Sequence, residues 1–172
     1  MVSRLVFSGV LLMAAPLFSQ TDPLLKDGAP EPAWFQLTED GEQVSKLLGK
    51  PTNVAEFGKD FVSWQFQIGS GHDDFSHVAV FRKSEGKLIS ITREYEPESN
   101  VDGLFPPSQT TACFFPDAAN PKFAVRVRRL SGGRLLMAMG TSKPGQKTGQ
   151  LLLIRETELG NFYSWIAAQL SK

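Results

Sequence analysis

The sequence has little cysteine and no excess of charge of either sign. Its 172 residues include one cysteine, Cys113, and the 18 basic residues balance the 18 acidic ones. A single thiol excludes an internal disulfide, and Cys113 lies between apolar residues in TTACFFP, which is typical of a buried structural thiol. A chain without basic excess lacks the charge that nucleic-acid binding requires. We therefore expect neither a disulfide scaffold nor a nucleic-acid partner.

Long apolar runs are also absent, except at the N-terminus. Arg4 precedes LVFSGVLLMAAPLF, and Ser19 and polar residues follow it. This order predicts a signal peptide over residues 1–19, cleaved near Ser19 or Gln20. The run is shorter than the ~20 residues of a membrane-spanning helix, so an uncleaved anchor is the weaker alternative. With no cysteine at its end for a lipid anchor, we expect an exported protein, periplasmic or secreted, that is not lipid-anchored.

The remaining chain has the length of one domain that can bury a core without disulfides. We expect an extended lead-in at 20–33 and a single domain at 34–172, with a long Pro-rich loop at about 96–121. Asp40, with Gln43 three residues later, predicts the start of a short helix. The apolar residues of VSKLL continue the helix, and Gly49 followed by Pro51 ends it.

Alternating residues in FVSWQFQI predict a strand that pairs with NVAEF in a first hairpin. HVAVFRK and KLISITREY form a second hairpin around Ser84, Glu85 and Gly86. FAVRVRRL, RLLMAMG and QLLLIRE predict three further strands, and residues 109–114 a possible additional one.

A final helix is predicted from about Glu158 to Leu170, capped by Thr157. We expect its aromatic stripe to pack on the last three strands; a partner-binding helix is the alternative.

These elements predict an α+β fold: a single domain with an antiparallel β-sheet of about six or seven strands, a short N-terminal helix and a C-terminal helix packed on the sheet. A profilin-like or PsbP-like layered arrangement is an alternative. The pattern leaves open whether the sheet is continuous from Val54 to Arg155 or split in two.

GTSKPGQKTG, residues 140–149, resembles a phosphate-binding loop, but Gln146 separates the second glycine from the lysine. A strand, rather than the helix that such loops require, is predicted after it. We therefore expect a hairpin loop and no nucleotide, and no cofactor is indicated elsewhere.

GHDDFSH contains the only two histidines of the chain. Its candidate metal ligands are His72, Asp73, Asp74 and His77, since imidazole and carboxylate groups bind divalent metals. A polar turn between two strands explains the same residues. A metal-dependent extracytoplasmic enzyme that uses this loop is accordingly the alternative function.

Charge is distributed unevenly along the chain. Residues 20–99 hold fourteen acidic and eight basic residues, whereas residues 100–172 hold four acidic and nine basic ones. Such asymmetry can mark a surface that meets an acidic partner or lipid headgroups. The candidate binding residues are Leu104, Phe105, Arg126 and Arg128. The alternatives are a loop folded over one end of the sheet and arginines that form a solvated strand face.

VSKLLGKP, residues 44–51, followed by two hairpins, resembles the exported SmpA/OmlA family and the wider fold of β-lactamase-inhibitor proteins. The resemblance covers about residues 37–94; the lipid-anchor cysteine of that family is missing, and no functional residue can be transferred. It implies a non-catalytic exported protein that acts through a surface. We therefore expect an exported binding or envelope-assembly-type protein, not an enzyme, with a possible envelope protein partner.

Overall fold

The computed structural model describes residues 25–26, 29–68, 75–108, 110–114, 124–140 and 148–171. The predicted signal peptide, most of the loop at 140–149 and residues 72–74 lie outside these ranges.

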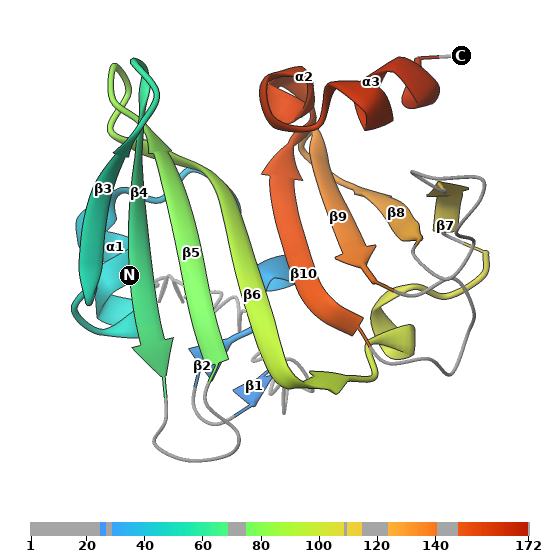
Figure 1. Cartoon of the computed structure of the whole chain (residues 1–172), viewed down its shortest axis with the longest axis horizontal. Helices are drawn as coiled ribbons and strands as arrows, with labels where there is room; N and C mark the ends of the chain where they lie inside the picture. The colour runs from blue at the N-terminus through green and yellow to red at the C-terminus, as the bar shows by residue number, and fades with distance from the viewer. Residues whose placement is uncertain are drawn as a thin grey trace, which may run out of the picture.

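One antiparallel sheet of eight strands forms the centre of the fold, in the order β3-β4-β5-β6-β10-β9-β8-β7 (Figure 1). Its strands are β3 (Asn53–Phe57), β4 (Phe61–Ile68), β5 (Phe75–Arg82), β6 (Lys87–Ser99), β7 (Thr110–Phe114), β8 (Val125–Leu130), β9 (Arg134–Met139) and β10 (Thr148–Arg155). The predicted α+β class is confirmed, and the sheet is continuous rather than split. It has one strand more than the upper expected number because the possible strand at 109–114 is present as β7.

The remaining elements cover this sheet or flank it. They are α1 (Gly41–Leu48), α2 (Leu159–Phe162) and α3 (Ser164–Leu170), the 3-10 turns η1 (Pro32–Trp34), η2 (Asp102–Leu104) and η3 (Glu156–Glu158), and a small sheet of β1 (Leu25–Lys26) and β2 (Ala29–Pro30). None of the helices in the described ranges is long and apolar enough to cross a membrane.

The sheet consists of two meanders, β3–β6 and β7–β10, in which consecutive strands pair. Strands β6 and β10 join them, with Leu151 opposite Arg93 and Ile154 opposite Ser90. The predicted hairpin glycine Gly86 adopts a φ of 62°, in the left-handed region that glycine enters without steric cost. The two meanders are therefore joined by an antiparallel pair of strands, as are the strands within each meander.

Helix α1 begins and ends as its sequence predicts. The backbone N–H of Gln43 donates to Asp40 Oδ1 at 3.0 Å, and the backbone N–H of Asp40 donates to Gln43 Oε1 at 2.9 Å. Gly49 follows the helix with a φ of 85°. These reciprocal bonds satisfy backbone donors that a helix N-terminus leaves unpaired.

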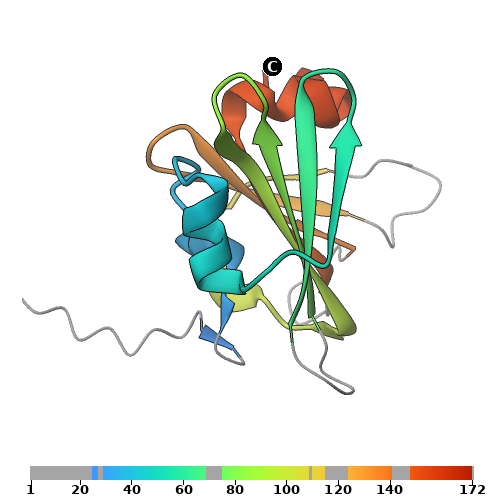
Figure 2. The ribbon, with the colours of Figure 1, turned by 90° about the vertical axis from the view of Figure 1, so that its left-hand side faces the viewer.

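The two faces of the sheet are buried under different elements. Leu136 and Ala138 of β9 point to the face covered by α1, whereas Leu135 and Met137 point to the face covered by α2 and α3, because side chains alternate along a strand. Figure 2 shows α1 on one side of the strands and α2 and α3 across their upper end. We call these faces the α1 face and the α3 face.

On the α1 face, Val44 and Leu48 of α1 join a large core with buried residues of β4, β5, β6, β9 and β10, and the partly buried Leu130 of β8 packs against it. Leu47, expected in the same apolar stripe, is instead half exposed. On the α3 face, Leu159 and Ile166 complete a smaller core over β8, β9 and β10. The predicted packing of the C-terminal helix on these three strands is confirmed.

The C-terminal helix differs from the prediction in its continuity. It is divided into α2 and α3 by Tyr163, whose φ of −137° and ψ of 60° are not helical. Thr157 lies within η3, and Glu158, which makes no side-chain cap bond, precedes α2. Gly160 and Asn161 are weak helix formers, so nothing local maintains one straight helix here.

Candidate functional site

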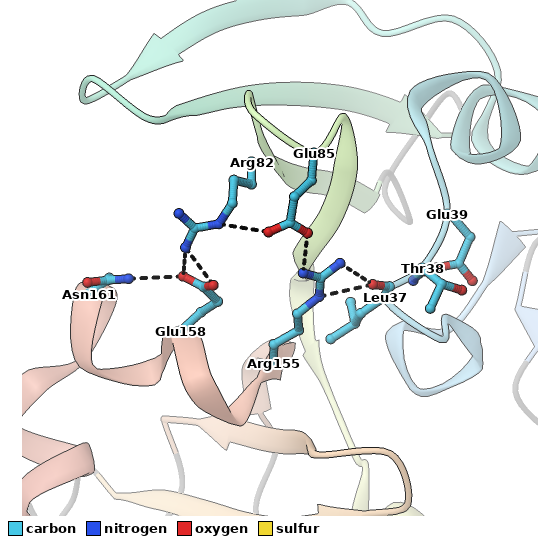
Figure 3. Close-up of polar contacts among 8 residues, drawn as sticks. All are labelled: Leu37, Thr38, Glu39, Arg82, Glu85, Arg155, Glu158 and Asn161. Carbon is cyan, nitrogen blue, oxygen red and sulfur yellow. Dashed lines mark hydrogen bonds and ion pairs between the residues drawn. The ribbon is translucent and has the colours of Figure 1, made fainter.

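Five polar side chains form a network where the β5–β6 hairpin meets the end of β10 and α2 (Figure 3). Arg82 Nη2 donates to both carboxylate oxygens of Glu158 at 2.6 Å, and Asn161 Nδ2 donates to Glu158 at 2.9 Å. Glu85 accepts from Arg155 Nη1 at 2.8 Å and lies 3.3 Å from Arg82 Nε. Each charge in the network therefore faces an opposite charge.

The electrostatics of this network favour fixed charges. Burial acts to raise the pKa of Glu158, but the hydrogen bonds from Arg82 and Asn161 outweigh it and the pKa is lowered. The hydrogen bond to Glu158 raises the pKa of Arg82. Both groups remain charged near neutral pH, which suits a structural ion pair and does not suit general acid–base chemistry.

The same network holds a strained residue, Leu37, whose φ is 61°. Arg155 donates to the Leu37 carbonyl through Nε at 3.1 Å and Nη2 at 2.7 Å. On either side of Leu37, the backbone N–H groups of Gln36 and Thr38 donate to the carboxylate of Glu39 at 2.8 and 2.9 Å. These four bonds fix the segment that crosses from η1 to α1.

The four predicted binding residues lie together, between η2 and β8. Arg126 Nη1 contacts Asp102 Oδ1 at 2.6 Å, and its guanidinium lies 5.1 Å from the centre of the Phe105 ring. Arg128 Nη1 donates to the Leu104 carbonyl at 2.8 Å. Phe105 is buried and Arg126 is only 7% exposed. The alternative of a solvated arginine face is therefore wrong for Arg126, which is buried and contacts Asp102 of η2.

The predicted metal ligands are only partly described. His72, Asp73 and Asp74 lie outside the described residues, and no group of three or more metal-ligating side chains occurs within them. His77 is buried in β5 and lies opposite Arg93 on β6. Cross-strand neighbours place their Cβ atoms about 5 Å apart, so this arginine disfavours a bound cation beside His77.

A buried polar group that sequence reasoning missed lies on the α1 face. Arg93 is fully buried, with Nη1 2.9 Å from Glu31 Oε1, and the Tyr95 hydroxyl donates to Glu31 Oε2 at 2.5 Å. Burial raises the pKa of Tyr95, and the Glu31 carboxylate raises it further, so the hydroxyl remains a donor. The available signal was the position of Arg93, in phase with the inward-facing Ile91 and Tyr95.

The outermost strand of the first meander is open to solvent. Among the described strands, β3 pairs only with β4, and all five of its residues are exposed. Val54 is 54% exposed and Phe57 is 50% exposed. Phe57 stacks on Phe162 of α2 with ring centres 5.6 Å apart. The sequence predicted the strand, but its place at the edge depends on the order of all eight strands.

Comparison with known proteins adds little to this description. No protein-family model and no curated protein matches the sequence. Among solved structures, the chain is similar to a cysteine-rich secretory protein from Staphylococcus aureus, with 9% identity and a TM-score of 0.46. The match covers 73% of this chain and 46% of that protein's chain.

Proposed function

We propose that this chain is an exported, non-catalytic binding protein that acts through strand β3, which adds an extended segment of a protein partner to its sheet. The exposure of every residue of this edge strand, including the apolar Val54 and Phe57, carries the proposal. The resemblance of VSKLLGKP to exported SmpA/OmlA domains supports the non-catalytic role.

Strand β3 lacks the devices that prevent edge strands from pairing. Proteins commonly protect such edges with proline, lysine or a β-bulge. The segment Asn53–Phe57 contains neither proline nor lysine, and its register with β4 is unbroken. Its one charge, on Glu56, is matched by Lys83 Nζ at 2.8 Å. The edge is therefore open to a second strand.

The chemistry of this edge favours an apolar extended segment. Val54 lies opposite Trp64 and Phe57 opposite Phe61, so the two exposed apolar side chains point to opposite faces of the sheet. An added strand gains main-chain hydrogen bonds from β3, and its alternate side chains contact Val54 on one face and Phe57 on the other. Its own apolar residues should alternate in the same way.

Site-specific photocrosslinking of the full chain in its native envelope or secreted fraction tests the proposal. A crosslinker at Val54 should label one discrete partner, whereas a crosslinker at exposed Gln169 on α3 should not. The purified partner should then slow hydrogen exchange at the β3 amides. Val54→Lys, which adds an edge charge to an exposed position, should abolish both effects, and Gln169→Lys should abolish neither. Equal labelling at the two positions, or unchanged exchange in β3, would overturn the proposal.

Export is tested separately by the N-terminus of the protein recovered outside the cytoplasm. Processing near Ser19 or Gln20 is the expected result. A chain that keeps residues 1–19 and stays in the cytoplasm contradicts it.

A further inference from the structure

Arg126 and Arg128 combine burial with unused hydrogen-bonding capacity. The two residues are separated by one position on β8, so they share one face of the strand, about 7 Å apart. Arg126 lies opposite Ala138 of β9, which belongs to the core of the α1 face. Both guanidinium groups therefore lie under the η2 segment.

Each arginine uses only part of its donor set. A guanidinium carries five N–H donors, yet within the described residues both side chains donate hydrogen bonds through Nη1: to Asp102 from Arg126 and to the Leu104 carbonyl from Arg128. Arg126 Nε and Nη2, and Arg128 Nε, are buried and have no hydrogen-bond partner in the part of the chain that the structure describes. Buried donors are normally paired, so these three atoms indicate a missing acceptor.

The geometry of the unused donors defines which acceptor group can bind to them. Nε and Nη2 form one edge of the guanidinium plane, and that edge can hold two oxygens of a carboxylate or phosphate group. Charge agrees with this choice, because the described residues place two arginines and one acid, Asp102, at the site. Among the described residues, Arg128 forms no ion pair, whereas its neighbour Arg129 contacts Glu156 Oε1 at 3.1 Å.

The margin of the site is partly exposed to solvent. Asp102, Leu104 and Arg128 are each partly exposed, and the buried Phe105 ring forms one wall beneath Arg126. We propose that Arg126 and Arg128 form a binding site for an oxyanion, a carboxylate or phosphate group, held by the Nε–Nη2 edge of Arg126 and by Nε of Arg128. This proposal is independent of the β3 edge and of any partner bound there.

Calorimetric titration of the full chain with sodium phosphate and with sodium acetate, at constant ionic strength set by chloride, tests the site. Arg126→Lys keeps the charge and removes the bidentate edge, and Arg128→Gln removes the second donor. Arg129→Gln is the matched control, since it removes the same charge from the same strand at an exposed position. We expect at least a tenfold loss of affinity for phosphate or acetate in the first two variants and less than twofold in the control.

Circular dichroism and cooperative urea unfolding show whether each variant folds. If Arg126→Lys does not fold, the comparison of Arg128→Gln with Arg129→Gln still tests the site. Vesicles of anionic phospholipid distinguish the source of the oxyanion. If the vesicles compete with phosphate for the chain, the ligand is a lipid headgroup; if they do not compete, the ligand is a soluble anion. Either result supports the site. No binding of either anion by the wild-type chain at tens of millimolar, or equal losses in all three variants, would overturn the proposal.

Discussion

The two faces of the sheet are covered by different means. On the α3 face, Leu159 and Ile166 pack in a core of apolar residues from β8, β9 and β10. On the α1 face, the apolar core is accompanied by the ion pairs Glu31–Arg93 and Asp102–Arg126. The cover of the α3 face is held mainly by apolar side chains, with the ion pair Arg82–Glu158, whereas the cover of the α1 face also depends on polar contacts to its backbone carbonyls.

The reason lies in the covering segments. Much of the cover on the α1 face is irregular chain, whose backbone carbonyls have no helical partners. Arginines supply those partners: Arg134 Nη1 donates to the Phe35 carbonyl at 2.6 Å, and Arg155 and Arg128 donate to further carbonyls of the cover. Buried carbonyls must be paired, so an irregular cover requires long donors from the sheet. A helical cover pairs some of its own backbone groups and so requires fewer such donors.

Removal of the α3-face cover should have the largest effect. A chain that ends at Glu158 loses Leu159 and Ile166, and exposes the apolar core residues of β8, β9 and β10. Each buried side chain contributes roughly 1.5–3 kcal/mol, against a domain stability of about 5–15 kcal/mol. We expect no cooperative urea unfolding for this chain, whereas a chain that ends at Leu170 should unfold normally. Cooperative unfolding of the shorter chain with little loss of stability contradicts the packing role.

The buried ion pair of the α1 face should rank second. Arg93→Met leaves the Glu31 carboxylate buried without its guanidinium, and loss of one partner of a buried pair costs about 3–5 kcal/mol. Glu31→Gln combined with Arg93→Met should recover part of this loss, since no unpaired charge then remains. Arg129→Met, at an exposed position, is the control and should change the free energy of unfolding by less than about 0.5 kcal/mol. A double variant no more stable than Arg93→Met contradicts the argument.

The network between the two covers should be sensitive to acid. Glu158→Gln removes a carboxylate that accepts from Arg82 and Asn161, at an expected cost of about 1.5–3 kcal/mol at pH 7. Because the pKa of Glu158 is lowered in the folded protein, its contribution is complete above the ordinary glutamate pKa and is lost as the pH falls through the folded value. The difference in the free energy of unfolding between wild type and Glu158→Gln, measured with urea, should therefore shrink as the pH is lowered.

Glu156→Gln is the matched control for this pH series. Glu156 pairs with Arg129 at the surface, where both side chains are more than a third exposed. Surface pairs contribute about 0–1 kcal/mol, so this variant should differ little from wild type at any pH. A constant difference between wild type and Glu158→Gln from pH 7 to pH 3 would exclude the acid-sensitive role.

The smallest effect concerns how closely each helix approaches the sheet. A methyl group on Gly41 of α1 would lie 2.8 Å from Trp64 Cζ3, whereas one on Gly160 of α2 meets nothing within 4 Å. Gly41→Ala should therefore cost about 1–3 kcal/mol through overpacking, and Gly160→Ala should be neutral or slightly stabilising. Melting temperatures of the two variants measure the contrast, and equal shifts contradict it.

Local features of this fold could be predicted from the sequence because their signals span few residues. The Asp40–Gln43 capping box and the Gly86 turn depend on neighbours within three or four positions. Features that depend on distant partners could not be predicted. Arg126 is buried because Asp102, 24 residues away, meets it. Strand β3 is an edge strand only because β10 pairs with β6 and not with β3.

The candidate sites follow the same rule. Leu104, Phe105, Arg126 and Arg128 lie together, but the sequence could show neither their proximity nor which nitrogen atoms of the arginines would be occupied. Three of the four candidate metal ligands in GHDDFSH lie outside the described ranges, and the metal site stays a prediction.

The join between the meanders also dictates an order of events during synthesis. The first meander, residues 53–99, is complete on the ribosome long before β10, the last strand of the chain, emerges. Until then the inner edge of β6 has no neighbouring strand. The Leu37 carbonyl also lacks its donor, because Arg155 lies 118 residues further along the chain. A growing chain thus carries two unpaired edges, β3 and β6, and only the second is closed by its own C-terminal half. The edge of β6, at the middle of the finished sheet, therefore stays open until the last strand is made.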